Sequence, residues 1–432
     1  MNERTRSVCP VCLRPVEAAR IGRKDGIYLH KKCPEHGAFM VPIWRGRLDF
    51  DSWRGGSKGL PKGQGLHCPE KCGICDEHEQ GTCCALLEVT QRCNLHCRFC
   101  FADGGGEGEE PGFEELKQAI ALIMERCGRP LLQLSGGEPT LRDDLPQLIR
   151  YAKSLGCPYV QLNTNGIRLA EDMSYVQALA QAGLSFVFLQ FDGVTEEVHR
   201  TLRGRDLFEI KRKAIENCGR CRLGVTLVPT VVRGVNETAL GDIIRFGALL
   251  SPVVRGIHFQ PVSFFGRYPE RPEEGQRYTL DELLSDICRQ TGLPFDAFLP
   301  SCCDHPLCGF HAAFLTSFDG TLTPVNHRKN SCQCGRTTAA QNREYIGRHW
   351  TRRDKTMADA EGTLAEGALS AGIPNMELFL RQMRAGSFTL TAMAFQDAMN
   401  LDVERLHRCS LHVYDNGTIK PFCAKYLTAV KD

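Results

Sequence analysis

The chain has 432 residues, of which 42% are hydrophobic and 24% are charged, the balance of a globular protein with a main domain and appended modules. A formal net charge of +2 argues against nucleic acid as a partner, and the lack of a long apolar run or a signal-like N-terminus argues against a membrane-spanning or secreted chain. In the cytoplasmic location expected from this, the 23 cysteines should bind metal or do redox work rather than form disulfides.

Residues 1–65 are expected to form a small metal module followed by a glycine-rich linker. Two short motifs carry this prediction, Cys9-x2-Cys12 and Cys33-x2-His36. Three thiolates and one imidazole suit a single ion, either zinc in a knuckle or iron in a rubredoxin-like site. The residues alone favour neither metal.

A second group of cysteines lies in residues 66–84 and is expected to bind an auxiliary cluster. Its members are Cys68, Cys72, Cys75 and Cys83. Three closely spaced thiolates, with a fourth from the following loop, are typical ligands of an iron–sulfur cluster. Zinc is the alternative, because His67 and His78 lie nearby in the sequence.

From residue 85 to residue 298, short apolar runs alternate with amphipathic segments, which is typical of βα repeats. The expected strands are Ala85–Thr90, Leu131–Ser135, Tyr159–Asn163, Ser185–Phe191, Leu223–Val231 and Val254–Gln260. The expected helices are Glu114–Arg126, Asp143–Leu155, Asp172–Gln181, Asp206–Asn217 and Thr238–Leu249. Continuous apolar strands indicate an α/β fold with a parallel sheet buried on both faces, curled into a partial or full TIM-type barrel, with an open doubly wound sheet as the alternative. In either fold, functional residues are expected at the carboxyl ends of the strands.

The first expected strand is followed by a loop with three cysteines, Cys93, Cys97 and Cys100. Their C-x3-C-x2-C spacing can place three thiolates around one object. A [4Fe–4S] cluster normally takes four thiolates, so three leave one iron open to another ligand. The aromatic Phe99 beside the last cysteine strengthens this interpretation over that of three buried thiols.

Further candidate residues follow the later strands. In Gly136-Gly137-Glu138-Pro139, the paired glycines let the backbone approach a ligand closely, and the carboxylate offers an acceptor for an ammonium group. A tight turn is the alternative for this motif. The other candidates at strand ends are Asn163, Asn165, Asp192, Arg233 and His258. Their alternatives are simple turns, a solvated loop arginine and a core histidine.

From residue 299 to the end the βα repeat is lost, and we expect a capping module that brings further ligands to the barrel mouth. It contains a helical stretch around Leu364–Arg384. Its candidate ligands for a third metal centre are Cys303, Cys308, Cys409 and Cys423, with Cys332 and Cys334 as alternative contributors. The thiols interpreted as buried or incidental are Cys127, Cys157, Cys218, Cys221 and Cys288.

With the cysteine loop and the Gly136–Pro139 motif about one βα unit apart, the chain resembles the radical S-adenosylmethionine (SAM) superfamily. The resemblance implies a partial (βα)6 barrel, a [4Fe–4S] cluster with SAM bound to its open iron, and a 5′-deoxyadenosyl radical that takes hydrogen from an unactivated carbon. It also implies that the Gly136–Pro139 motif holds the SAM amino group and that Asn163, Asn165 and Asp192 lie near the ribose and the substrate. Arg233 would then meet the SAM carboxylate, and His258 would lie near the adenine.

Other phrases resemble the tetraether lipid synthase family and its bacterial relatives. They are Cys9-Pro-x-Cys12, Cys33-x-x-His36-Gly37, Cys68-Pro-x-x-Cys72-Gly-x-Cys75, Thr82-Cys83, Cys303-x-His305-Pro-x-Cys308, Glu404-Arg405 before Cys409, and Pro421-Phe422-Cys423-Ala424. This resemblance implies two auxiliary [4Fe–4S] clusters, a rubredoxin-like iron and carbon–carbon bond formation on a lipid-like substrate. Cys84, Cys332 and Cys334 depart from that family, and adjacent cysteines at 83–84 are similar to a bacterial branch of radical SAM seleno- or cysteine-containing proteins (TrsS-like).

The expected partners are a small-molecule or lipid substrate and an electron donor such as ferredoxin or flavodoxin, with no nucleic acid. Contact with a membrane surface stays open through an apolar rim such as Phe264–Phe265. Methyl transfer to a small molecule or lipid is the alternative reaction. A non-catalytic electron-transfer or metal-binding protein is the alternative class, which would explain the cysteines but not the motifs at successive strand ends.

Overall fold

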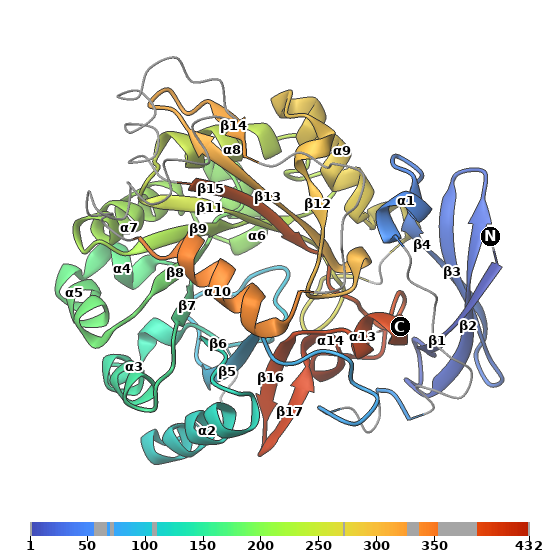
Figure 1. Ribbon diagram of the computed structural model, residues 1–432, viewed down its shortest axis with the longest axis horizontal. Helices are drawn as coiled ribbons and strands as arrows, with labels where there is room; N and C mark the ends of the chain where they lie inside the picture. The colour runs from blue at the N-terminus through green and yellow to red at the C-terminus, as the bar shows by residue number, and fades with distance from the viewer. Residues whose placement is uncertain are drawn as a thin grey trace.

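The computed structural model describes residues 2–55, 67–69, 73–105, 110–270, 273–325, 337–352 and 387–430. Within these ranges the chain forms a small four-stranded sheet and a large thirteen-stranded sheet (Figure 1). The expected features that lie outside the described residues are Cys72, Cys332, Cys334 and the helix at Leu364–Arg384.

The small sheet is antiparallel and is built by the N-terminus. Its strands, in order, are β1 (Asn2–Val8), β2 (Pro15–Arg23), β3 (Gly26–Cys33) and β4 (Gly37–Trp44), and α1 (Phe50–Arg54) follows. Buried Arg20 docks this sheet on the C-terminal part of the chain: its Nε donates to Asp402 Oδ2 at 2.8 Å, and the same guanidinium pairs with Glu404. Lys31, also buried, donates from Nζ to the Ala398 carbonyl at 2.6 Å. Charged groups thus join the two ends of the chain in its interior.

Six parallel strands form the centre of the large sheet, as the sequence predicts. They are β5 (Cys84–Thr90), β6 (Leu131–Gly136), β7 (Val160–Thr164), β8 (Phe186–Gln190), β9 (Gly224–Val228) and β11 (Val254–Pro261), with the short β10 (Thr230–Val231) beside β11. Neighbours in the chain are neighbours in the sheet from β5 to β9. The apolar runs that signalled these strands are buried on both faces, as in other parallel sheets.

Helices cover the outer face of these strands (Figure 1). They are α2 (Phe113–Arg126), α3 (Leu145–Ser154), α4 (Ile167–Glu171), α5 (Met173–Ala182), α6 (Glu196–Arg203), α7 (Phe208–Arg220) and α8 (Leu240–Leu249). The expected helices are confirmed, while α4 and α6 add two short ones. On β8, Val187 and Leu189 pack into the cluster that these helices share, whereas Phe186 and Phe188 face the opposite, inner side.

The C-terminal region adds strands to both edges of the large sheet rather than forming a separate cap. Beside β11 lie β15 (Ser387–Met393), β13 (Gly309–Thr316), β12 (Leu299–Pro300) and β14 (Leu322–Pro324). Beside β5 lie β16 (Leu411–Asp415) and β17 (Thr418–Pro421). Unpaired edges of the six-stranded centre are thereby covered. The other helices are α9 (Leu280–Thr291), α13 (Val403–His407) and α14 (Phe422–Lys425).

One helix, α10 (Ala339–Trp350), lies on the inner face of the curled sheet. The Trp350 ring contacts the rings of Phe186 and Phe188, with centroids 5.6 and 4.8 Å away. Glycine is required on both sides of this contact: a Cβ on Gly224 would lie 2.2 Å from the Trp350 carbonyl oxygen, and one on Gly347 would lie 2.1 Å from the ring of Tyr159. The helix therefore fills part of the space inside the barrel.

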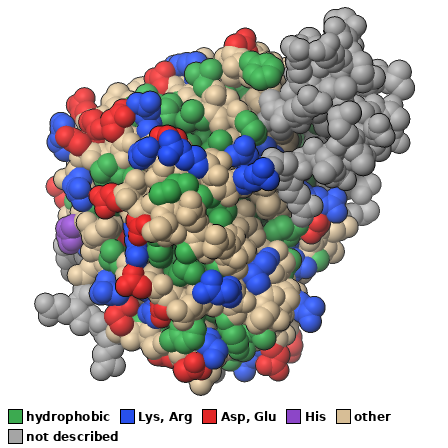
Figure 2. Space-filling view, turned by 90° about the vertical axis from the view of Figure 1, so that its left-hand side faces the viewer, with side chains coloured by type: hydrophobic (Ala, Val, Ile, Leu, Met, Phe, Trp, Pro, Cys, Tyr) green, Lys and Arg blue, Asp and Glu red, His purple; other side chains and the backbone are tan. Residues whose placement is uncertain are grey.

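Charges of both signs are mixed on the face of the molecule that the outer helices cover. Figure 2 shows acidic and basic side chains interspersed on the helix-covered side, and many form pairs along one helix, such as Lys117 with Glu114. Phe264 and Phe265, expected as an exposed apolar rim, are only 4% and 5% exposed, so the structure corrects that expectation. Among the described residues, no helix combines the length and the apolar character needed to cross a membrane.

Candidate functional site

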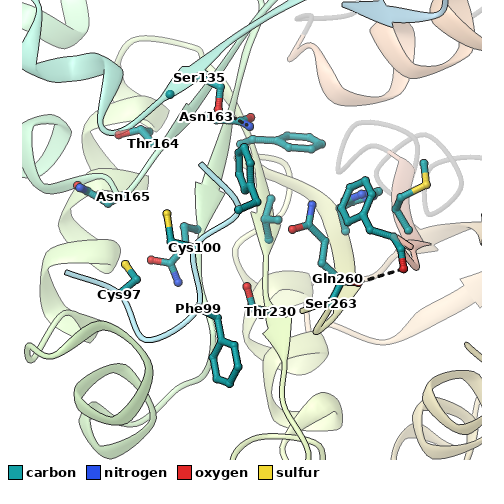
Figure 3. A pocket seen from close by; sticks show the side chains of 18 of the residues that line it. Cys97, Phe99, Cys100, Ser135, Asn163, Thr164, Asn165, Thr230, Gln260 and Ser263 are labelled. Atoms are coloured by element: carbon teal, nitrogen blue, oxygen red, sulfur yellow. Dashed lines mark hydrogen bonds between the residues drawn. The ribbon is translucent and has the colours of Figure 1, made fainter. Parts of the chain in front are cut away.

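A cavity of about 230 Å³ lies where the parallel strands end, as expected for a βα fold. The expected residues that line it are Cys93, Cys97, Phe99, Cys100, Gly136, Gly137, Glu138, Asn163, Asn165 and His258. The expected residues that are not among its lining are Pro139, Asp192 and Arg233. In Figure 3 the loop with Cys97 and Cys100 lies on one side of the cavity, and Gln260 and Ser263 lie on the other.

The backbone of the cysteine loop is held by two arginines from other elements. Arg267 donates from Nε to the Cys97 carbonyl at 3.0 Å and from its amide to the Cys100 carbonyl at 2.9 Å. Arg203 donates from Nη1 to the Phe99 carbonyl at 3.3 Å. With the loop fixed in this way, all three of its thiols line one cavity. This donor set fits a [4Fe–4S] cluster with one open iron.

The glycine that ends β6 and the one that follows it are needed where this strand meets the segment that leads into the cysteine loop. Gly136 has a φ of +124°, and a Cβ there would lie 2.2 Å from the Thr90 carbonyl oxygen. A Cβ on Gly137 would lie 2.1 Å from the Arg92 carbonyl oxygen. No side chain fits at either position, because the obstructing atoms are backbone. The motif therefore brings the end of β6 directly against the loop that carries the thiols.

Buried Glu138 ties the ends of β6 and β7 together. Its Oε1 accepts from the hydroxyls of Thr140 and Thr164 at 2.6 and 2.7 Å. Its Oε2 accepts from the backbone amide of Asn165 at 2.7 Å. Since a carboxylate oxygen has two lone pairs, Oε2 retains acceptor capacity toward the cavity that Glu138 lines. Pro139 starts the 3₁₀ turn behind it.

Asp192 acts behind the cavity, through Arg203. The two side chains form a buried bidentate pair, with Nε–Oδ2 and Nη2–Oδ1 distances of 2.7 and 2.8 Å. Burial alone would raise the pKa of Asp192, but the adjacent guanidinium outweighs it and lowers this pKa. Arg203 itself lines the cavity, so a fixed cation faces the site.

Arg233, expected at the SAM carboxylate, is engaged elsewhere. Its Nη2 donates to Glu282 Oε1 at 2.7 Å and to the Arg277 carbonyl at 3.1 Å, and its guanidinium lies over the ring of Tyr278. The expectation of a cavity arginine at this position is therefore wrong. The physical reason is local: the loop after β10 packs toward α9, which supplies the carboxylate partner.

His258 lies on β11 and lines the cavity. Its Nδ1 lies 2.8 Å from the Thr391 hydroxyl on the neighbouring β15. Burial lowers the pKa of this imidazole to about 4, so the ring is neutral near pH 7. It is both a core histidine, packed 6.1 Å from the Trp350 ring, and a cavity residue.

The distal cysteines group differently from the sequence prediction. Three of the four expected ligands, Cys308, Cys409 and Cys423, line one small cavity of about 20 Å³. Arg405 also lines it and donates from Nε to the Cys308 sulfur at 3.3 Å. The fourth, Cys303, instead packs in a buried cluster with Cys83, although the sequence prediction placed these two thiols in different centres.

The other members of the second cysteine group lie apart from Cys83. Cys68 is buried and lies 3.5 Å from His407 Nε2, and Glu77 is close enough to complete a three-ligand set with them. Cys75 is exposed. His407 lies more than 300 residues after Cys68 in the sequence, so no local spacing could predict that its imidazole lies beside this thiol.

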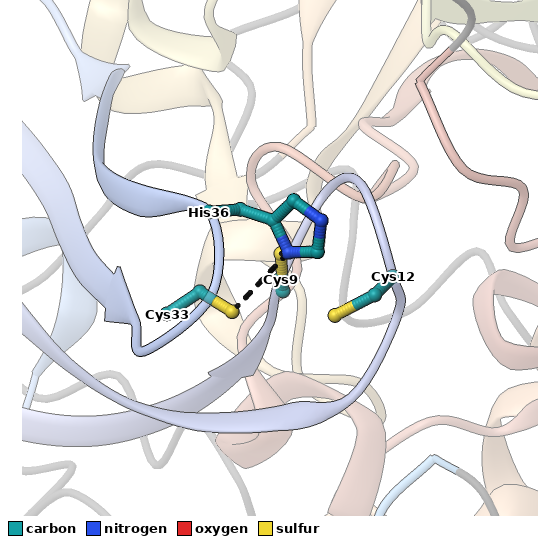
Figure 4. Close-up of side chains that lie close together, drawn as sticks. All are labelled: Cys9, Cys12, Cys33 and His36. Carbon is teal, nitrogen blue, oxygen red and sulfur yellow. Dashed lines mark hydrogen bonds between the residues drawn. The ribbon is translucent and has the colours of Figure 1, made fainter.

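The four predicted ligands of the N-terminal module do converge. The ligand atoms of Cys9, Cys12, Cys33 and His36 all lie within 4.8 Å of one another (Figure 4). His36 Nδ1 lies 3.6 Å from the Cys9 sulfur and 3.5 Å from that of Cys33. The hydrogen bond with His36 lowers the pKa of the Cys33 thiol to about 6. Three thiols and an imidazole at this separation suit one tetrahedral ion.

Several site residues were missed by sequence reasoning. They are Gln133, Ser135, Gln190, Arg203, Thr230 and Gln260, which line the cavity, and Lys211, which supports it. Lys211 is fully buried on α7 and bonds to the Asn165 carbonyl and, at 3.0 Å, to Gln190 Oε1. The alternation of side chains along a strand could have identified some of the polar cavity residues, since Gln133 and Ser135 lie on one face of β6.

The buried lysine gives a pH prediction. Burial lowers the pKa of Lys211 to about 7, against about 10.4 in an unfolded chain. Between these values the unfolded chain holds a proton that the folded protein lacks, so this group makes the free energy of unfolding rise with pH. Lys211→Met should remove that rise, measured by urea unfolding at about pH 7 and about pH 9.5. The control is Lys213→Met, whose side chain is 47% exposed; parallel pH profiles for wild type and Lys211→Met would contradict the prediction.

Comparison with known proteins gives two family matches and a full-length relative. Residues 87–247 match the radical SAM superfamily, and residues 1–45 match the HMPTM N-terminal zinc ribbon domain. The chain is 34% identical to 7,8-dihydro-6-hydroxymethylpterin dimethyltransferase of Methanocaldococcus jannaschii, over 98% of this chain and 93% of that protein. It is 30% identical to a probable GTP 3′,8-cyclase of Pyrococcus abyssi, over 40% of this chain and 56% of the cyclase.

Solved structures with a similar fold include Streptococcus suis SuiB, with 15% identity and a TM-score of 0.40 over 49% of this chain and 46% of SuiB. Another is anSMEcpe with bound AdoMet and the Cp18Cys peptide, with 20% identity and a TM-score of 0.38 over 48% of this chain and 58% of that one. The chain spans about half the length of each, and the likeness concerns the fold alone.

Proposed function

Because the chain belongs to the radical SAM superfamily, we propose that its strand-end cavity binds a [4Fe–4S] cluster with SAM and directs their chemistry to an unactivated carbon of the substrate. The observation that carries this is the convergence of three thiols from one loop with the polar ends of the neighbouring strands on one cavity. When bound, the cluster and SAM supply a 5′-deoxyadenosyl radical by reductive cleavage, a reaction that belongs to the cofactor rather than to the protein.

The residues around the cavity would bind and orient the cluster and SAM. The cluster would be held by Cys93, Cys97 and Cys100. Glu138 Oε2 would accept from the SAM ammonium group, and Arg203 would face its carboxylate in place of Arg233, since Asp192 keeps that guanidinium fixed. Asn163 and Asn165 would bond to the ribose hydroxyls, and the neutral ring of His258 would lie against the adenine.

Two further metal centres are part of the proposal. Cys308, Cys409 and Cys423 would hold an auxiliary iron–sulfur cluster, with Arg405 beside the thiolates. This centre would neighbour SAM, because the two cavities share lining side chains, namely Met393, Phe395, Leu411 and Phe422. The N-terminal Cys3His set would hold one ion: zinc, as the name of the matched domain has it, with iron as the alternative. An auxiliary cluster on Cys68, Cys72 and Cys75 stays a prediction.

For the substrate reaction, methyl transfer to a carbon of a reduced pterin has the most support. The relative that this chain matches over almost its full length carries a dihydropterin dimethyltransferase name. The cysteine loop also lies at one wall of a partly enclosed pocket, which limits the access of water to a reactive carbon. The electron for SAM cleavage would come from a ferredoxin or a flavodoxin.

A second candidate is carbon–carbon coupling of lipid-like chains, in line with the resemblance to the tetraether lipid synthases. The observation that favours it is an aromatic wall on the C-terminal side of the cavity. Phe265, Phe395 and Phe422 line that wall, and the Phe395 and Phe422 rings are stacked with centroids 4.3 Å apart. An apolar wall of this kind suits an alkyl chain.

Product analysis tests the proposal. In parallel assays, anaerobically reconstituted protein would be given a reductant, SAM and either 7,8-dihydro-6-hydroxymethylpterin bearing deuterium on carbon or a lipid with alkyl chains. We expect deuterium in the released 5′-deoxyadenosine and one or two added methyl groups on the pterin, both read by mass spectrometry. Each methyl group would replace the abstracted hydrogen and come from a second SAM molecule, which takes one electron from the reductant and leaves as S-adenosylhomocysteine. Coupled lipid chains with an untouched pterin would favour the second candidate. A wild-type protein that leaves SAM intact with either substrate would refute both.

A further inference from the structure

A second and larger cavity lies inside the barrel, next to the SAM cavity. Its volume is about 560 Å³, in the range of sites that bind small molecules. It lies between α10 and the inner faces of β11, β13 and β15. All of the described residues that line it come after residue 247, where the match to the radical SAM superfamily ends. His258 and Met393 line both cavities, so they form the boundary between them.

The lining of this chamber combines flat apolar rings with neutral hydrogen-bonding groups. Phe310, Tyr345 and Trp350 supply the rings. The polar groups include Ser301, Gln341, Asn342, Thr389 and Thr391. None of the described residues that line it is a lysine or an arginine, and Asp304 is its one carboxylic acid. The described lining therefore offers no cationic side chain to balance the charge of an anionic ligand.

Two polar groups in the chamber have no hydrogen-bond partner among the described residues: the Tyr345 hydroxyl and the ring nitrogens of His311. The Tyr345 ring is fixed by stacking on His349, with centroids 4.0 Å apart, and its centroid lies 6.3 Å from that of His311. Burial raises the pKa of Tyr345 to about 12 and lowers that of His311 to about 4. Both groups are therefore neutral near pH 7, and each can donate a hydrogen bond to a ligand.

We propose that this chamber is the substrate site and that it takes a neutral, flat ring system with hydrogen-bonding edges, such as a reduced pterin. The inference rests on the proposed function and adds to it the place and the contacts of the substrate. Tyr345 and His311 would bond to the ring edge, and Trp350 and Phe310 would cover its faces. The reacting carbon would meet the SAM cavity at His258 and Met393.

The chamber chemistry separates this ligand from two others. A nucleoside triphosphate would bring several negative charges to a chamber whose described lining has no lysine or arginine to compensate their desolvation. A bare alkyl chain would leave the Tyr345 hydroxyl and the His311 nitrogens buried without partners, which is also costly. A neutral heterocycle satisfies both the rings and the polar groups.

Binding measurements on the full-length, anaerobically reconstituted protein test the inference. The probe is 7,8-dihydro-6-hydroxymethylpterin in equilibrium dialysis, with and without SAM. The variants are Tyr345→Phe combined with His311→Phe, which removes the polar contacts, and Ser301→Phe, which fills the chamber from its β12 side. Tyr151→Phe is the matched control, because this half-buried tyrosine belongs to the outer helix α3 and packs against the main core, and it is not among the chamber residues. We expect the Kd to rise about tenfold or more in both chamber variants and to stay unchanged in the control.

Reductive SAM cleavage without substrate, measured on every variant, shows that the SAM cavity is intact and should not change. Equal affinity of wild type and both chamber variants for the dihydropterin would overturn the chamber as the site. A wild type that binds a lipid precursor but no dihydropterin would overturn the ligand class. Failure of the proposed function has a different signature, since the wild type would then form no 5′-deoxyadenosine at all.

Discussion

Replacing Cys97 and Cys100 together by alanine is expected to abolish formation of 5′-deoxyadenosine from SAM. The two thiols line the SAM cavity from one loop, and without them a single cysteine of that loop remains to hold the cluster. The loss should exceed the roughly 100-fold effect typical of removing an outer-shell partner. Iron should fall by about four per chain, while iron at the other centres and the metal of the N-terminal module stay.

The matched control is Cys218→Ala with Cys221→Ala. This pair has the same x2 spacing, but it lies on α7 and at its end, where Cys218 is packed in the outer core. We expect unchanged iron content and unchanged SAM cleavage in this control. If the Cys97, Cys100 variant still cleaves SAM, another group of cysteines holds the catalytic cluster, and the assignment of the loop is wrong.

Arg20→Met is expected to lower the free energy of unfolding by about 3–5 kcal/mol, the cost of breaking a buried ion pair from one side. The Arg20 side chain is fully buried, and it bonds to Asp402 and Glu404, whose side chains are 4% and 8% exposed. Burial alone would lower the pKa of Arg20, but these two carboxylates outweigh it and raise this pKa. Its removal takes this cation from both carboxylates, and the Arg54 guanidinium, 3.9 Å from Glu404 Oε1, lies farther away. Urea unfolding and limited proteolysis of the N-terminal sheet would measure the effect.

Arg23→Met provides the comparison, since Arg23 ends the same strand but is exposed. It should change the free energy of unfolding by no more than about 0.5 kcal/mol. A loss below about 1 kcal/mol in Arg20→Met, close to that of an exposed pair, would show that the N-terminal sheet does not depend on these contacts.

The central strands and helices were predictable because their signals are local. Each apolar run, such as the one that becomes β6, lies between segments with helical periodicity, and its carboxyl end carries the motif that lines the cavity. The C-terminal strands gave no such signal. β15 and β16 are single strands without a βα interval, and their partners β11 and β5 lie more than 100 residues earlier.

The difference between local signals and contacts of distant residues also explains which site residues could be predicted. One loop carries Cys93, Cys97 and Cys100, so their spacing alone predicts that the three thiols lie close together. The pairing of Cys83 with Cys303 depends on how the tail folds back, and no spacing contains that information. Arg203 was missed and Arg233 wrongly expected for a related reason. Arg203 ends the helix α6 and Arg233 follows the strand β10, and only the buried pairing with Asp192 or Glu282 decides which one faces the cavity.

The position of β15 and β16 has a consequence for synthesis on the ribosome. The six central strands leave the exit tunnel in order, yet β15 and β16, which cover the two sides of this sheet, and the carboxylates that receive Arg20 all follow them in the chain. Until β15 and β16 have been synthesised, β5 and β11 present open edges that other chains can pair with. Folding can therefore be completed only after these strands have left the ribosome, by contacts that join residues as far as 420 positions apart. A nascent chain of this kind is exposed to aggregation at these edges until β15 and β16 arrive.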